Sequence, residues 1–216
     1  GIATSIGHAP LAALANPAAG SVLAIAEALT NIVWAPLSKG LQSVSLSANW
    51  MWPCKNVGED ARLYKAVEAC SDFACSLGIN IPTGKDSLSM TQKYGNEKVL
   101  SPGTVIISAG AEVSDVKKVI SPVLVNDIDT SIYYIDFSFH KMELGGSVLY
   151  QTLNKVGKTT PNVEDPEYFA TAFETIQELI NKGFILAGHD ISEGGMITAL
   201  LEMCKKKKKG GLDVNY

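Results

Sequence analysis

The chain has 216 residues, of which 46% are hydrophobic and 19% are charged, and its formal net charge at pH 7 is −4. This composition predicts one large or two small packed domains and excludes an intrinsically disordered chain. A slightly acidic chain lacks the basic field of nucleic-acid-binding proteins, so we expect no nucleic-acid partner. No apolar stretch reaches the roughly 18 residues that a membrane span needs, so we expect no membrane contact.

The four cysteines contain no C-x-x-C pair, and the two nearest are five residues apart, a poor spacing for a shared metal on one helix. Free thiols in a reducing compartment are therefore expected, which favours a cytoplasmic location. We expect no signal peptide. The chain lacks an initiator methionine and stops where a strand-like pattern begins, so we expect truncation at both ends.

The first part of the chain alternates helical and extended patterns. Residues 18–34 carry an apolar stripe at helical spacing, and residues 59–77 carry a second one that Gly78 ends. Strands are predicted at residues 43–48, 80–82 and 103–113. A loop is expected at residues 83–87.

The polar stretch from Ser114 to Asp129 is the best domain boundary. It gives a first domain of residues 1–115, a linker of residues 116–130 and a second domain of residues 131–216. In the second domain the predicted elements are strands at 131–137 and 184–190, a short helix opened by Gly145–Ser147, a helix from Asp165 to Lys182 and a helix over 192–204. The alternation of strands and helices in both parts predicts the α/β class with mixed sheets.

The segment GHDISEGG (residues 188–195) combines a carboxylate with the glycine-rich start of a predicted helix. A helix start offers free N–H groups and partial positive charge, and Asp190 offers a hard oxygen ligand. Together with Ser192 this arrangement suits a magnesium-bound phosphate. A purely local D-x-S helix cap is the alternative.

Glu27 and Asn31 are four residues apart on the first predicted helix, nearly opposite its apolar stripe. This spacing stacks both side chains on one face, and both present the oxygen ligands that magnesium prefers. Two polar residues on a solvated face are the alternative interpretation.

Three further features have both a functional and a structural interpretation. Gly84, Lys85 and Ser87 offer phosphate-contact chemistry, although the P-loop spacing is absent and an ordinary turn is the alternative. The tryptophans of SANWMWP, in a predicted loop, suit either a packed core or a pocket wall. His8 is either catalytic or structural. The Lys205–Lys209 run is most simply a solvated C-terminal turn.

Taken together, the strings GIATSIGHAPLAALANPAAG, SLSANWMWPC, GINIPTGKDSLSM and GHDISEGG resemble the phosphoribosylformylglycinamidine synthase family in its large single-chain form. The resemblance covers nearly the whole chain, and the Lys205–Lys209 run departs from it. It implies an aminoimidazole-ribonucleotide-synthetase-like fold, with a barrel-forming N-terminal domain and a closing C-terminal domain. The chain would form most of the second half of the synthetase core.

The resemblance also implies cofactors and site residues. The family converts formylglycinamide ribonucleotide, ATP and glutamine to the amidine, and its second half resembles a retained Mg–ADP site. Its magnesium ligands map onto Glu27, Asn31 and Asp190, and its nucleotide contact maps onto Ser192; a further aspartate ligand lies upstream of this sequence. The loop containing Gly84 would belong to the catalytic cleft, with Lys85 facing phosphate and Ser87 facing substrate.

Three functional hypotheses follow from these patterns. The first is a piece of an ATP-dependent carbon–nitrogen ligase that is inactive alone, because the first half and the glutaminase are elsewhere. The second is a stand-alone Mg–ADP-binding structural or regulatory module. The third is a small kinase-like relative, which the SANWMWPC motif disfavours. The expected partners are nucleotide, formylglycinamide ribonucleotide, the remaining domains and, through exposed strand edges, a second copy.

Overall fold

A four-stranded mixed sheet forms the centre of the computed structural model, which describes residues 1–125, 127, 129–139, 141–205 and 212. In spatial order its strands are β1 (Ile2–His8), β6 (Thr104–Glu112), β2 (Ser45–Met51) and β3 (Asn80–Ser87). β6 is antiparallel to both of its neighbours, whereas β2 and β3 are parallel. The parallel pair is joined through α3 (Glu59–Ser76), because parallel neighbours need a crossover connection.

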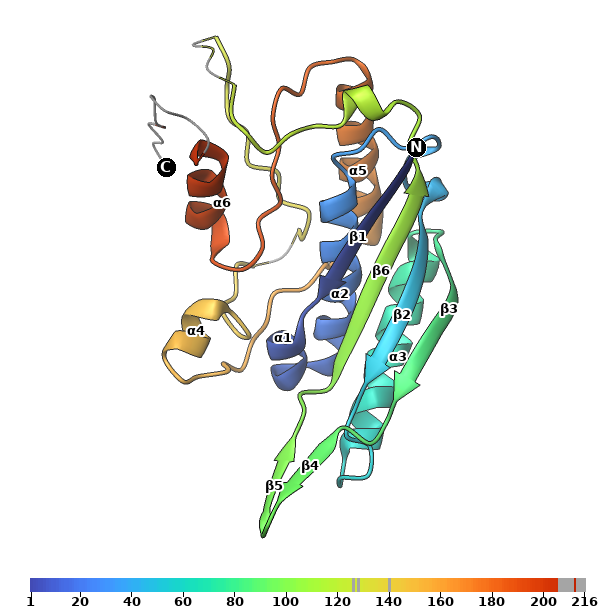
Figure 1. Cartoon of the computed structure of the whole chain (residues 1–216), viewed down its shortest axis with the longest axis vertical. Coiled ribbons are helices and arrows are strands. Elements are labelled where there is room, and N and C mark those ends of the chain that lie inside the picture. Colours follow the sequence, from blue (N-terminus) through green and yellow to red (C-terminus); the bar gives the residue numbers. More distant parts are fainter. Residues whose placement is uncertain (126, 128, 140, 206–211, 213–216) are drawn as a thin grey trace.

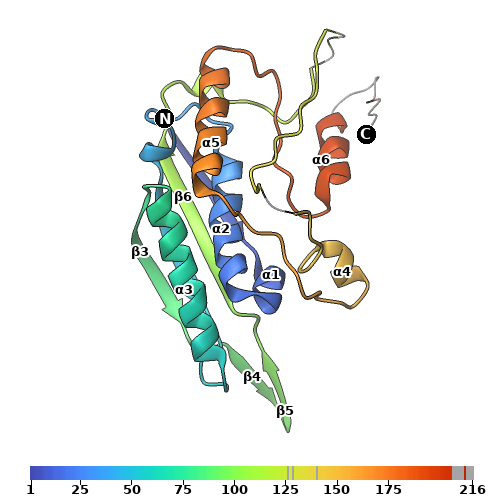
Figure 2. The same ribbon diagram turned by 180° about the vertical axis from the view of Figure 1, so that it is seen from behind.

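One face of this sheet packs against helices. Val105, Ile107, Ala109 and Ala111 alternate along β6 and are buried, whereas Ser108, between two of them, is exposed. The buried face is covered by α2 (Pro17–Ile32), α3 and α5 (Pro166–Asn181), as the two opposite views show (Figures 1 and 2). No helix of the described chain covers the other face, where a Cβ added to Gly110 would meet nothing within 4 Å.

Two of the long helices, α2 and α5, begin at side-chain caps. The Asn16 side chain accepts hydrogen bonds from the backbone N–H groups of Ala18 and Ala19, directly after the short helix α1 (Pro10–Ala15). Asp165 caps α5 in the same way, with Pro166 in the first turn. The helices predicted at 18–34, 59–77 and 165–182 are therefore confirmed to within about two residues at each end.

The strand predictions were only partly right in the first block. β1 was not predicted, and neither was the hairpin of β4 (Thr91–Tyr94) and β5 (Glu97–Leu100). The expected loop at residues 83–87 is the second half of β3, and the expected loop around Trp50 belongs to β2. These stretches are polar because they lie at an edge or on the open face of the sheet, and pairing with neighbouring strands decides their conformation.

The strands predicted at 131–137 and 184–190 are wrong. Among the residues described beyond Val113, none forms a strand; the regular elements there are the 3₁₀ turn η2 (Val116–Lys118), α4 (Val148–Thr152), α5 and α6 (Gly195–Cys204). The apolar runs have no neighbouring strand to pair with, and Tyr133 and Phe184 are 82% and 71% exposed. The mixed α/β sheet is thus confirmed for the first block alone.

The helix α5 packs into the core of the first block. Phe169, Phe173, Ile176 and Ile180 are buried among residues of α2, α3 and the sheet, and the Phe73 and Phe169 rings meet edge to face at 5.7 Å. The buried Gln177 accepts a hydrogen bond from the backbone N–H of Leu37 at 2.8 Å. Its amide donates to two backbone carbonyls, those of Val33 at 2.6 Å and Ala35 at 3.0 Å. One hydrophobic core therefore includes residues from both sides of the expected linker.

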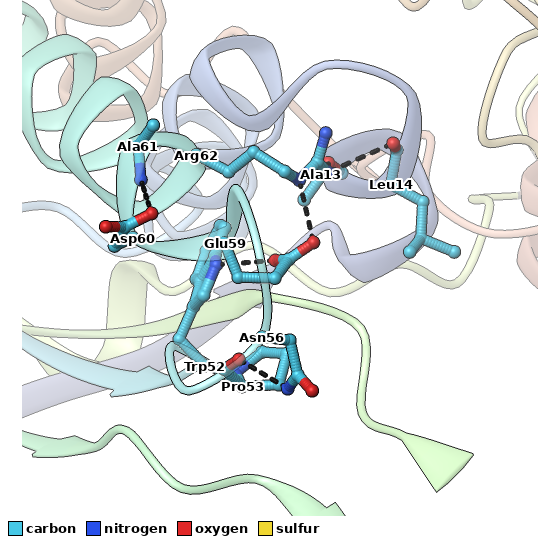
Figure 3. Close-up of polar contacts among 9 residues, drawn as sticks. All are labelled: Ala13, Leu14, Trp52, Pro53, Asn56, Glu59, Asp60, Ala61 and Arg62. Carbon is cyan, nitrogen blue, oxygen red and sulfur yellow. Dashed lines mark hydrogen bonds and ion pairs between the residues drawn. The ribbon is translucent and has the colours of Figure 1, made fainter. Parts of the chain in front are cut away.

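Trp52 belongs to the core, which was one of its two expected roles. It is 1% exposed, and its indole N–H donates to Glu59 Oε2 at 2.9 Å (Figure 3). The other Glu59 oxygen lies 3.4 Å from Arg62 Nε, and the Arg62 guanidinium donates to the backbone carbonyls of Ala13 and Leu14 at the end of α1. This chain of contacts joins β2, α3 and α1.

The described structure also bears on the cysteines, on membrane-spanning helices and on the lysine run. All four cysteines are free, and burial raises the pKa of the Cys70 thiol to about 12, so this thiol is unreactive. Within the described ranges no helix is both long and apolar enough to cross a membrane. Of the Lys205–Lys209 run only Lys205 is described; the predicted C-terminal turn otherwise lies outside the described residues.

Candidate nucleotide and metal site

The side chains of Glu27 and Asn31 lie one turn apart on α2 and both have tertiary contacts. Asn31 Nδ2 donates to the backbone carbonyl of Ile6 in β1 at 3.1 Å. Glu27 Oε1 accepts a hydrogen bond of 3.0 Å from the hydroxyl of Ser192, which is 165 residues away in the sequence. Both side chains are partly buried, so this face of α2 is not fully solvated.

Ser192 does not cap the helix that follows it. The helix α6 begins at Gly195, three residues later than predicted, and no side chain caps its N-terminus. Its preceding residue, Gly194, has a φ of +90°, a left-handed conformation that favours glycine. The Ser192 hydroxyl therefore donates to Glu27 of α2 and does not cap α6, so the alternative of a purely local D-x-S cap is wrong.

Asn31 and Asp190 line the same cavity. It has a volume of about 430 Å³ and lies between the end of α2, the start of β1 and the segment that precedes α6. Its walls are otherwise mainly apolar, with Trp34, Ile120 and Pro122 among them. The tertiary structure thus brings Asn31 of the first block and Asp190 of the second block into one cavity, which is how mostly apolar ligand pockets acquire a few polar contacts; Glu27 and Ser192 do not line this cavity.

The local electrostatics place Glu27 close to both Asp190 and His8. The pKa of Glu27 is raised above its ordinary value, chiefly because burial disfavours the charged form; the Asp190 carboxylate adds to the effect. The Ser192 hydroxyl and His8, through its charge and its backbone, act in the opposite direction. A cation between the two carboxylates would offset the unfavourable burial and repulsion of their charges.

The donor set suits magnesium better than a softer metal. Glu27, Asp190 and Asn31 offer two carboxylates and an amide oxygen, all hard ligands, and Mg²⁺ usually retains several waters beside one or two carboxylates. Nowhere in the described part of the chain do three or more His, Cys, Asp or Glu side chains gather as a metal site. The residues therefore fit an ion shared with a phosphate ligand rather than one enclosed by protein alone.

The other predicted residues lie elsewhere. In the register of β2 and β3, Lys85 pairs with Asn49 and Ser87 pairs with Met51, which places both on the sheet face opposite α2. The Lys85 ammonium contacts the Ser87 hydroxyl and donates to the carbonyl of Asp86. A Cβ at Gly84 would lie 2.2 Å from the carbonyl oxygen of Ala48, so glycine is needed there for strand packing.

Two contributors to the site were not resolved by the sequence. His8 was left open between a catalytic and a structural role, and it lies at the end of β1 beside Glu27. Trp34 was not singled out, yet it forms part of the cavity wall. The β-branched residues Ile2, Thr4 and Ile6 at alternate positions were the available signal for β1.

Comparison with known families identifies both blocks. Residues 1–112 match the FGAR-AT PurM_N-like domain, and residues 137–213 match the C-terminal domain of AIR synthase related proteins. The chain belongs to the FGAR-AT PurM_N-like domain family. The resemblance to phosphoribosylformylglycinamidine synthases is thereby confirmed.

Curated relatives are similar over nearly the whole chain. The chain is 42% identical over 206 residues to phosphoribosylformylglycinamidine synthase of Drosophila melanogaster. The matched region covers 94% of this chain and 15% of the relative. The chain is 39% identical over 211 residues to the probable chloroplastic/mitochondrial enzyme of Arabidopsis thaliana, covering 97% of this chain and 15% of the relative. It therefore spans about 15% of the length of these proteins.

Solved structures agree in fold. T. maritima PurL complexed with FGAR superposes with a TM-score of 0.65 at 16% identity, over 94% of this chain and 31% of that one. The complex of the same protein with ADP gives a TM-score of 0.58 at 13% identity, over 95% of this chain and 29% of that one. At such low identity these likenesses show the fold alone.

Proposed function

We propose that this chain is part of an ATP-dependent carbon–nitrogen ligase that converts formylglycinamide ribonucleotide, glutamine and ATP to formylglycinamidine ribonucleotide in de novo purine biosynthesis. The family membership and the similarity to phosphoribosylformylglycinamidine synthases over nearly the whole chain support this. Since the chain spans about 15% of those relatives, we expect it to have no ligase activity alone. A cytoplasmic location is proposed, with the four free thiols as support.

Within this enzyme we propose that the chain carries an auxiliary Mg–ATP or Mg–ADP site. Glu27, Asn31 and Asp190 would hold Mg²⁺, and Ser192 would contact the nucleotide. The observation that carries this proposal is the Ser192–Glu27 hydrogen bond, which brings the two predicted half-sites together. When bound, the ion would neutralise phosphate charge; the chain's own part is to orient the nucleotide and the ion.

A second part of the proposal concerns Gly84, Lys85 and Ser87. They lie on β3, which borders the uncovered sheet face, and Lys85 is exposed there. In the complete enzyme Lys85 would neutralise phosphate charge and Ser87 would hydrogen-bond substrate during phosphoryl transfer to the amide oxygen and displacement by ammonia. Their separation from Glu27 by the sheet favours a structural role for the auxiliary nucleotide. A stand-alone Mg–ADP-binding regulatory module is the alternative function that this separation supports.

We further propose that residues 1–115 form a barrel-forming domain, residues 116–130 a linker and residues 131–216 a closing domain whose helix α5 packs into the core of the first domain. The uncovered face of the sheet would be the barrel-facing surface, and the remaining domains of the enzyme would cover it. The side chains of Ile2 and Ile6 in the edge strand β1 are 83% and 58% exposed. Because exposed large apolar side chains often mark an interaction surface, they support a partner on this side of the sheet.

The nucleotide site is tested by calorimetric titration of the chain with ADP, with and without Mg²⁺. We expect saturable one-to-one binding that depends on Mg²⁺, and an increase in melting temperature with ligand, because a ligand that binds only the folded state stabilises it. A chain that folds but shows neither effect would contradict the site and leave only the family membership standing.

The exposed sheet face predicts self-association. We expect the isolated chain to form a dimer by analytical ultracentrifugation, and Ile6→Lys to weaken the dimer at least about tenfold by placing a charge in the apolar contact. Tyr64→Lys, at a 68% exposed position of α3 on the other side of the molecule, is the matched control and should leave the dimer intact. A wild-type chain that stays monomeric at high concentration would rule out this role of the face.

A further inference from the structure

The segment that carries Asp190 and Ser192 lacks regular structure. Residues 184–192 form neither helix nor strand, so no ladder of backbone hydrogen bonds fixes the two proposed contacts. A site residue on such a segment needs tertiary contacts, because metal and phosphate sites require ligands held close to their productive geometry. The contacts of this segment therefore decide whether Asp190 is available to a metal.

Two anchors hold this segment on either side of Asp190. Gly188 donates its N–H to the carbonyl of Ser121 at 3.2 Å and lies flat against the Trp34 ring, where an added Cβ would come within 2.0 Å of a ring carbon. Ser192 is held by its hydrogen bond to Glu27. Asp190 lies between these anchors, and its carboxylate is near that of Glu27, which disfavours an orientation toward the site unless another group holds it.

The imidazole of His189 supplies the missing contact. Its Nδ1 lies 2.7 Å from the backbone oxygen of Asp190 and 3.3 Å from Asp190 Oδ1. Its Nε2 lies 3.3 Å from Glu202 Oε2, in the last turn of α6. The ring therefore connects α6 to Asp190, and with both nitrogens engaged it is not itself a ligand.

We propose that His189, held by Glu202, is a positioning residue that orients the Asp190 carboxylate toward Glu27 and Asn31. This inference rests on the proposed nucleotide site. It explains how an irregular segment can present a metal ligand. The segment is held by α6 through the contact of Glu202 with His189, and by α2 through the hydrogen bond between Ser192 and Glu27. Partners that orient metal-binding side chains typically contribute 10–100-fold to metal affinity.

The test is Glu202→Ala, with Glu193→Ala as the control for charge. Glu202 is half-exposed and in a helix, where alanine is favourable, so the variant should fold. Glu193 is exposed and next to Ser192, so its removal takes the same charge from the same region without touching His189. We expect Glu202→Ala to raise about tenfold the Mg²⁺ concentration for half-maximal ADP binding, and Glu193→Ala to change it less than twofold. His189→Ala should match Glu202→Ala, and the double variant should lose little more, because the two residues act through one contact.

A second measurement separates this inference from the nucleotide site. Without Mg²⁺ or nucleotide, we expect the amides of residues 188–192 to exchange hydrogen faster in Glu202→Ala than in the wild type and in Glu193→Ala. Unchanged exchange, or equal Mg²⁺ dependence of the two alanine variants, would overturn the positioning role. If the wild type binds no Mg–ADP, the proposed site fails, and faster exchange in Glu202→Ala would still sustain the contact that positions Asp190.

Discussion

Glu27→Gln should abolish most Mg–ADP binding while making the unliganded chain more stable at neutral pH. Glutamine keeps an oxygen that accepts the Ser192 hydrogen bond but removes one of the two carboxylate charges that would balance the charge of Mg²⁺. We expect the affinity for Mg–ADP to fall at least about tenfold, because even residues that only hydrogen-bond to a metal ligand contribute that much to metal affinity. Opposite signs for binding and for stability distinguish a functional carboxylate from a structural one.

The stability gain follows from the pKa of Glu27. Because burial raises this pKa, the folded chain binds the proton more tightly than the unfolded chain, so stability falls as pH rises from the ordinary value of 4.5 through the raised value. The Glu27→Gln variant has no carboxyl group to ionise at this position, so it does not lose this stability as the pH rises. Its advantage in melting temperature should therefore be largest at neutral pH without Mg²⁺ and should disappear below about pH 4.5.

The measurements are calorimetric titration with Mg–ADP and thermal unfolding across this pH range. Glu68→Gln makes the same chemical change at an exposed position of α3 and should alter neither quantity. Unimpaired binding by Glu27→Gln would remove Glu27 from the magnesium ligands. A variant that binds normally but melts at a lower temperature would make Glu27 a structural residue.

Gln177→Leu should be strongly destabilising, by about 3 kcal/mol. The substitution keeps the volume of the side chain but leaves the buried N–H of Leu37 and the carbonyls of Val33 and Ala35 without their partner. Each buried polar group left without a hydrogen bond costs about 1–3 kcal/mol, and partial relaxation reduces the sum. Because Gln177 joins α5 to the chain that follows α2, this loss would also test how firmly the two blocks are joined.

Urea unfolding followed by circular dichroism measures this effect. Glu178→Gln, at the next residue of α5, removes only a surface ion pair with Lys182 and should leave the urea midpoint almost unchanged. We expect one cooperative transition for the wild type, since α5 shares the core of the first block. A loss below about 0.5 kcal/mol for Gln177→Leu, or two separate transitions, would contradict this single core.

The sequence by itself determined the elements whose signals are local. Asp165–Pro166 marks a helix start because a side-chain oxygen and a fixed φ act on the next few residues. The spacing of Glu27 and Asn31 places both on one face of α2 whatever surrounds the helix. The quoted motifs also sufficed to recognise the family that the comparisons then showed.

Tertiary structure decided what depends on distant partners. β3 is a strand despite its turn-like residues because β2 pairs with it, whereas residues 184–190 remain irregular because no described strand lies beside them. The joining of Glu27 to Ser192 and of Asp190 to Glu202 through His189 has no local signal, since these contacts form only when the core brings α2 and α6 near one segment. Local sequence thus set the helix starts and faces, and long-range packing set the site.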